Sequence, residues 1–170
     1  MNLIFNSFIL FILPTCSLLH VETALKSPDN SNRSENADQN KYCLYEGKGV
    51  DGYDLVTFFE EDPLKGNEKF KSSYDGVSYL FKNKINKDKF DQNPKKYLPK
   101  YGGWCATNMA SKQLTKPRLD LYIVNEKGLF LFERTLGVNG KILWSNNEVE
   151  YEKLANHNYN YLIEKGKFPD

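Results

Sequence analysis

Hydrophobic positions divide the chain into three stretches of different character. Residues 3–19 form an apolar run that carries no charge, and residues 21–41 are polar and contain no aromatic residue. From Tyr42 onward, aromatic and aliphatic residues recur at short intervals. A polar stretch of this kind buries too little apolar surface to offset the entropy of ordering. The pattern therefore predicts a signal peptide over residues 1–20, a disordered polar tether over 21–41 and one folded domain over 42–170.

Within the third stretch, short periodic segments alternate with turn residues. The spacing predicts helices and hairpins without the long crossovers that parallel strands require, so the expected fold class is α+β, with antiparallel β-hairpins and short helices in one small domain. The expected helices are 54–59, 83–92, a segment from Cys105 to residue 112, and 148–164. The expected hairpins are 70–81, which contains the turn pair Asp75-Gly76, and 119–133, which turns at Gly128.

The first apolar run is shorter than the roughly 20 residues of a membrane span, and Pro14 interrupts it. A signal peptide needs a shorter apolar core, so export is the expected reading. Residues 1 and 2 supply no Lys or Arg, which leaves an uncleaved anchor as the alternative. The segment Leu13-Pro14-Thr15-Cys16 resembles a bacterial lipobox, with Cys16 as the lipidation site. Two outcomes are open: a periplasmic or membrane-anchored lipoprotein attached through Cys16, or a Cys16 that is discarded with the signal peptide.

Charge and composition exclude several classes of function. The sequence has 23 Lys plus Arg against 22 Asp plus Glu, a net charge of +1, which gives no electrostatic basis for binding nucleic acid. With 3 Cys and 2 His it is neither a disulfide scaffold nor a zinc finger. One of those histidines, His157, lies in a polar stretch and is expected on the surface. No phosphate loop, nucleophile elbow or paired-carboxylate motif is visible, so the sequence predicts no catalytic residues.

A series of short motifs, in order and spacing, resembles the exported bacterial proteins called YHS domain-containing proteins over about residues 49–146. The resemblance implies a small α+β domain of a group often attached to copper and heavy-metal transporters. Metal-site versions of that domain carry paired Cys, whereas this chain has one Cys in the motif region and Lys116-Pro117 where the family has Asp-Pro. The motifs are Gly52-Tyr53-Asp54, Tyr74-Asp75-Gly76-Val77, Pro94-Lys95-Lys96-Tyr97 and Tyr101-Gly102-Gly103-Trp104-Cys105-Ala106.

Cys105 is the strongest candidate for chemistry. It follows two Gly where a helix is expected to start, and free N–H groups there lower the pKa of a thiol. Met109 lies four residues on, hence on the same helix face. A thiolate and a thioether are soft ligands suited to copper as Cu(I). The alternative is that both are ordinary buried hydrophobic side chains.

Cys43 is the other Cys of the expected domain. In an exported protein, two Cys can pair, so a disulfide between Cys43 and Cys105 is a second possibility. Such a bond would compete directly with metal binding by Cys105.

The remaining motif residues are assigned to a binding pocket built around the Gly-Gly turn. Asp54 is at a position where carboxylates more often cap a helix than act as a base, and Tyr residues beside such turns more often pack than react. The expected pocket residues are Tyr53, Asp54, Tyr101, Gly102, Gly103 and Trp104.

These observations give three hypotheses. The first is an exported, lipid-anchored YHS-type binding module that takes copper near Cys105. The second is a cofactor-free structural or protein-interaction domain of the cell envelope with an unidentified partner there. The third is an enzyme that uses Cys105 as nucleophile, for which this His-poor chain offers no evident base.

Overall fold

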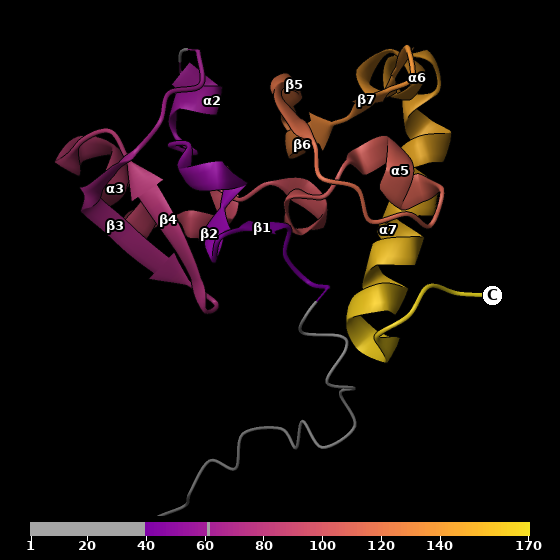
Figure 1. Cartoon of the computed structure of the whole chain (residues 1–170), viewed down its shortest axis with the longest axis horizontal. Coiled ribbons are helices and arrows are strands. Elements are labelled where there is room, and N and C mark those ends of the chain that lie inside the picture. The colour runs from indigo at the N-terminus through magenta and orange to yellow at the C-terminus, as the bar shows by residue number, and fades with distance from the viewer. Residues whose placement is uncertain (1–39, 61) are drawn as a thin grey trace, which may run out of the picture. The chain divides into compact units, whose positions relative to one another are not determined.

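The computed structural model describes residues 40–170 except residue 61 (Figure 1). The predicted signal peptide, the lipidation site at Cys16 and the tether as far as residue 39 lie outside the described residues. The described part mixes short helices with small sheets, so the expected α+β class is confirmed. The strands are β1 (Leu44–Tyr45), β2 (Lys48–Gly49), β3 (Asn67–Tyr74), β4 (Val77–Phe81), β5 (Arg118–Asn125), β6 (Gly128–Phe132), β7 (Arg134–Thr135) and β8 (Val138–Asn139). The helices are η1 (Val50–Gly52), α2 (Thr57–Glu60), α3 (Lys84–Gln92), α4 (Pro94–Tyr97), η2 (Lys100–Gly103), α5 (Ala106–Ala110), α6 (Gly140–Asn146) and α7 (Glu148–Lys165).

The first hairpin forms where the sequence predicts it. Strands β3 and β4 pair antiparallel across Asp75 and Gly76, whose φ angles of 48° and 78° give the turn that matches strand twist. The sheet order is β1-β2-β4-β3, and one parallel pairing, Lys48 with Ser78, joins β2 to β4. The predicted antiparallel sheet is therefore extended by a short parallel contact.

The second hairpin, β5 with β6, is also as predicted. It is followed by two elements that the sequence pattern did not indicate, the β7–β8 hairpin and helix α6. The Asn139 side chain caps α6 by accepting a hydrogen bond from the Lys141 N–H at 3.0 Å. Helix α6 is only seven residues long, and Trp144 is its one fully buried large side chain. Its sequence therefore shows no repeating hydrophobic pattern that would predict a helix.

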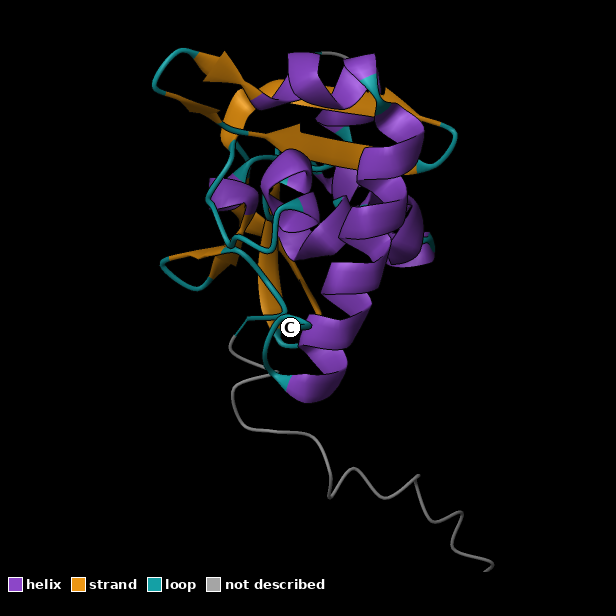
Figure 2. Cartoon of the chain, turned by 90° about the vertical axis from the view of Figure 1, so that its right-hand side faces the viewer, coloured by secondary structure: helices purple, strands orange, loops and turns teal. Residues whose placement is uncertain are grey.

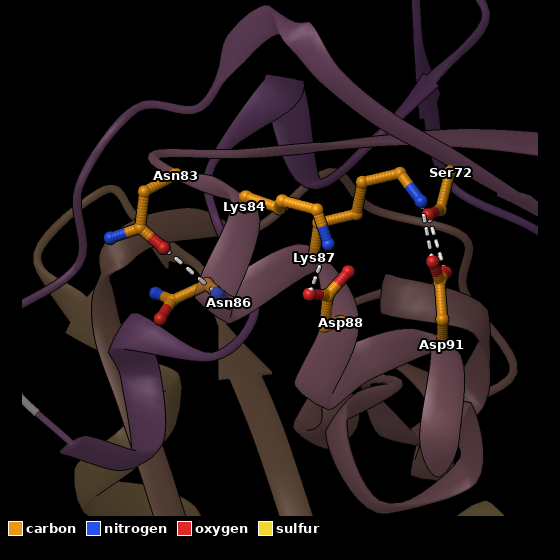
Figure 3. Close-up of polar contacts among 7 residues, drawn as sticks. All are labelled: Ser72, Asn83, Lys84, Asn86, Lys87, Asp88 and Asp91. Atoms are coloured by element: carbon orange, nitrogen blue, oxygen red, sulfur yellow. Dashed lines mark hydrogen bonds and ion pairs between the residues drawn. The ribbon is translucent and has the colours of Figure 1, made fainter.

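Helix α3 begins after Asn83, whose side chain accepts a hydrogen bond from the Asn86 N–H at 2.8 Å (Figure 3). Its polar face carries the ion pair of Lys84 with Asp88, and its last turn is joined to β3 through Ser72 and Asp91. Asn83 thus fixes where the helix starts, as expected for an N-cap residue.

The last helix, α7, matches the predicted segment and ends at Gly166 with φ 74°. Helices α6 and α7 lie on the side of the domain that faces the viewer in Figure 2. Helix α5 is shorter than expected. It ends at Ala110, where the backbone turns to a left-handed φ of 59° at Lys112, and the Asn158 side chain, from α7, donates to the carbonyls of Met109 and Ala110, both at 3.0 Å.

Strand β6 separates two hydrophobic clusters. Leu129 and Leu131 point into a cluster built on β4, α3 and the loop before α2, whereas Phe130 and Phe132 point into a cluster built on α5, α6 and α7. Successive side chains of a strand alternate between its faces, so one short strand serves both clusters. Among the described residues, none of the helices has the length and apolar character needed to cross a bilayer.

Candidate functional site

The Gly-Gly turn lies between two residues, Pro99 and Cys105, that each pair with strand β6. Pro99 bridges Leu129 and Cys105 bridges Leu131, both in parallel. Pro99 and Cys105 are six positions apart, whereas Leu129 and Leu131 are two apart, so the four residues of η2 form an insertion between the two pairings. Tyr101, Gly102 and Gly103 have φ angles of 54°, 61° and 89°, so three successive residues are left-handed. A left-handed non-Gly residue such as Tyr101 costs on the order of 1 kcal/mol or more, so surrounding contacts must hold it.

The same local conformation precedes the Gly-Tyr-Asp motif. Val50, Asp51 and Gly52 of η1 have φ angles of 52°, 49° and 69°, and the N–H of Tyr53 donates to the Val50 carbonyl at 2.9 Å. The Gly-Tyr-Asp motif and the Gly-Gly-Trp-Cys motif therefore each begin at the end of a turn with left-handed backbone.

The turn η2 holds residues 40–43, which we call the leading segment. The N–H of Cys43 donates to the Gly102 carbonyl at 2.9 Å, and the indole N–H of Trp104 donates to the Asn40 carbonyl at 2.9 Å. From α7, the Tyr159 hydroxyl donates to the Lys41 carbonyl at 2.8 Å. Asn40 and Lys41, the end of the predicted tether, are therefore hydrogen-bonded to the domain.

Close packing explains why glycine stands at position 102. A Cβ placed on Gly102 would lie 1.9 Å from the Lys41 carbonyl oxygen, closer than any real contact. Gly102 thus serves both a left-handed backbone and the close passage of another chain segment.

Cys105 and Met109 are sealed in the core, each with 0% of its surface exposed. Cys105 lies directly before α5, and the N–H of Met109 donates to its carbonyl at 2.9 Å, which places the two side chains one helical turn apart. The Cys105 sulfur accepts a hydrogen bond from the Glu133 N–H at 3.3 Å.

The expectation of a lowered Cys105 pKa is wrong. Burial raises the pKa of Cys105, and the backbone N–H groups of residues 107, 108 and 133, which act in the opposite direction, do not compensate. Removing the thiolate from water disfavours the charged form more than a five-residue helix favours it. The thiol is therefore protonated at neutral pH and is a poor nucleophile.

The possible disulfide between Cys43 and Cys105, which the sequence left open, is not formed in the structure: both residues are free thiols. Cys43 is buried beside Tyr45 and Gly103, whereas Cys105 is engaged with the Glu133 backbone. Each thiol is thus held by its own neighbours.

The Asp54 side chain is fully buried, with 0% of its surface exposed, and it joins several elements through hydrogen bonds. One carboxylate oxygen accepts from the Val56 N–H at 2.9 Å, and the other accepts from the Lys82 N–H and the Asn86 side chain, both at 2.8 Å. Three elements meet on this one carboxylate: the turn before α2, the end of β4 and the first turn of α3. Asp54 is a structural residue here, as its position near a helix start indicates.

The six residues assigned to a pocket are not all brought together. Tyr101 and Gly102 line a hollow of about 300 Å³ with Tyr42, Lys100 and Tyr159 among its other walls. Asp54 is buried, and the Tyr53 ring packs under the Lys65 ammonium at 4.4 Å from the ring centroid. Gly103 faces Cys43, and Trp104 reaches the leading segment.

Metal donors are sparse in the described part of the chain. Residues 40–60 and 62–170 contain no group of three or more His, Cys, Asp or Glu arranged to hold a metal ion. His157 is exposed, as expected, and its ring lies beside Tyr161. Among the sequence-predicted site residues, Cys105 and Met109 are the two that offer sulfur donors to a soft metal, and Cys43 is a further free thiol of the described part.

The sequence pattern did not single out Lys95, Lys96 or Lys100, which line the two hollows beside the turn. A signal was present, since three lysines within six residues flank Leu98-Pro99. Their convergence depends on how α4 and η2 are placed, which no local pattern reveals.

The buried ionisable groups predict an alkaline weakness. Burial raises the pKa of Cys43 from its ordinary 9.0 to about 11 and also raises the pKa of Tyr79 and of Tyr101. Above about pH 9 the unfolded chain releases protons that the folded protein keeps, so the free energy of unfolding should fall as pH rises. Urea unfolding between about pH 8 and pH 11 measures this, and Cys43→Ala should make the fall shallower. An unfolding free energy that stays constant across this range would contradict it.

The YHS domain family model matches residues 56–101, from the turn before α2 to Tyr101. Gly102, Cys105 and Met109 lie beyond the matched residues. Comparisons with curated proteins and with solved structures gave no match.

Proposed function

We propose that the protein, whose residues 56–101 match the YHS domain family model, is a non-enzymatic binding module of the cell envelope in which Cys105 and Met109 pack in the core without a metal. The observation that carries this proposal is the complete burial of Cys105 and Met109. We propose further that the apolar first run exports the protein and that Cys16 anchors it through a lipid. Both of these rest on the sequence pattern.

The burial of the two sulfur atoms favours this function over catalysis. A nucleophilic thiol needs access to substrate and a pKa near the working pH, whereas Cys105 is sealed and its pKa is raised. The Gly102 carbonyl accepts a hydrogen bond from the Cys43 N–H, and the Gly102 Cα lies close to the Lys41 backbone, so this part of the turn is engaged within the domain. The arrangement thus supports a rigid module that presents its surface to a partner.

A second candidate is a soft-metal module, since the YHS resemblance associates the domain with metal-handling proteins. Cys105 and Met109 offer a thiol and a thioether one helical turn apart, which suits Cu(I). This donor set fits Cu(I) only in part, because binding would require the core to open and the thiol to lose its proton. In this second candidate function, Cys105 and Met109 would bind the copper, and the module would store it or transfer it.

Titration of the purified chain with Cu(I), in competition with a Cu(I) chelator, distinguishes the two candidates. We expect no stoichiometric copper that survives the chelator, and no native reaction of Cys105 with a thiol reagent near neutral pH, because burial excludes both. The variants Cys105→Ser and Met109→Leu, with Cys43→Ser as the matched control, locate any site. One copper lost in the first two variants and kept in the control would overturn the metal-free proposal and establish the second candidate.

A further inference from the structure

Two hollows adjoin each other on either side of residues 98–100. One is about 370 Å³ and includes Phe59, Lys96 and Glu126 in its wall, and the other is about 300 Å³ and includes Tyr42 and Tyr74. Lys95 and Lys100 line both. The two hollows therefore share part of their wall, and Lys95 and Lys100 contribute to both.

These lysines differ from most others in the described part of the chain. Lys48, Lys65 and Lys89 each form an ion pair with a carboxylate, and Lys127, in the wall of the first hollow, is held by Glu148 and Glu152. Within the described residues, none of Lys95, Lys96 and Lys100 forms an ion pair; Lys96 instead covers the Tyr97 ring at 4.9 Å.

The positive charge of these three lysines is therefore not balanced by ion pairs. Among the residues that line the two hollows, Glu126 is the one acidic side chain, set against Lys95, Lys96 and Lys100. In a chain whose net charge is only +1, three positive groups in the wall of one hollow make a local site for an anion. Apolar surface continues from it, through Phe59 and Leu98 in the first hollow and tyrosine rings in the second.

We infer that this surface binds a phosphate monoester with an apolar organic part, in contact with Lys95, Lys96 and Lys100. A phosphate monoester carries close to two negative charges and three acceptor oxygens, which matches three ammonium groups better than a carboxylate does. Lysine binds phosphate as a point charge and needs no fixed fork geometry, so exposed, mobile side chains suffice. The organic part would lie on Phe59 and Leu98. This inference goes beyond the proposed function and can fail without affecting it.

Titration of the whole chain with phenyl phosphate at low salt, followed by calorimetry or amide chemical shifts, tests the site. We expect saturable binding that weakens as salt is added, because the interaction is between charges near the surface. The double variant Lys95→Gln/Lys100→Gln should bind at least about tenfold more weakly. Glu126→Gln should bind more tightly, since it removes the opposing charge. Lys95 and Glu126 are exposed and Lys100 is half-buried, and none of the three belongs to either hydrophobic cluster.

The matched control is Lys69→Gln/Lys71→Gln on β3, which removes the same charge from exposed positions outside both hollows. It should bind phenyl phosphate like the natural chain. Vesicles of phosphatidylcholine with and without phosphatidic acid distinguish a lipid headgroup from a soluble ester. Binding that depends on phosphatidic acid and on Lys95 and Lys100 identifies the headgroup, whereas binding of phenyl phosphate alone identifies a soluble ester. No binding of either probe, or equal losses in the control, would overturn the inference.

Discussion

Replacing Asp54 with Ala should lower the free energy of unfolding by about 3 to 5 kcal/mol. The carboxylate accepts hydrogen bonds from Val56, Lys82 and Asn86 in a fully buried position. Removing it leaves three donors without a partner, and each buried unsatisfied donor costs roughly 1 to 3 kcal/mol. Partial relaxation toward water keeps the total below the sum of the upper values. Urea unfolding followed by circular dichroism measures the loss.

Two further variants separate hydrogen bonding from packing. Asp54→Asn keeps the shape but turns an amide N–H₂ toward donors on one side, so it should lose most of the same stability. Asp88→Ala removes an exposed carboxylate that pairs with Lys84 on the same helix, and it should cost roughly half a kcal/mol or less. An Asp54→Ala loss as small as that of Asp88→Ala would show that the Asp54 hydrogen bonds are not stabilising.

Gly102→Ala should release the leading segment and lower the free energy of unfolding by about 3 to 4 kcal/mol. A Cβ at this position would lie 1.9 Å from the Lys41 carbonyl oxygen, so the segment must move away. The hydrogen bonds to the carbonyls of Asn40 and Lys41 and from the N–H of Cys43 would then be lost. Hydrogen exchange of the Cys43 amide reports the release directly, and unfolding in urea reports its energetic cost.

Gly76→Ala is the matched control for backbone strain. Gly76 also has a left-handed φ, of 78°, but nothing lies within 4 Å of a Cβ built there. Alanine at position 76 should therefore cost only the strain, about 1 kcal/mol, and leave Cys43 exchange unchanged. Equal effects at the two glycines would mean that the close contact with Lys41 does not matter.

Local signals in the sequence were sufficient for most elements. The hairpin at Asp75-Gly76, helix α3 after Asn83 and helix α7 before Gly166 are formed where the sequence predicts them. Each of these is specified by neighbours within a few residues: a turn that favours positive φ, a side chain that caps a helix start, or a glycine that ends one. Helix α6 was missed because seven residues give too little periodicity to detect.

The chemistry of the Cys105 region was harder to predict, because it depends on burial. The sequence places Cys105 after two glycines and Met109 four residues on, and the structure keeps that spacing. Whether the thiol has a lowered or a raised pKa depends on what covers it. Leu131 of β6, which pairs with Cys105, and the Glu133 N–H, which donates to its sulfur, both come from later in the chain.

The sequence by itself determined the fold class, both long hairpins, helices α3 and α7, and the likeness to YHS domains that the family match over residues 56–101 supports. Only the tertiary structure decided that Cys105 and Met109 are fully buried and that Gly102 packs closely against residues 40–43. It also decided that Lys95, Lys96 and Lys100 line neighbouring hollows. The physical reason is distance along the chain. Turns and caps are interactions between near neighbours, whereas burial, close backbone approach and unbalanced charge arise between segments that are brought together only by folding.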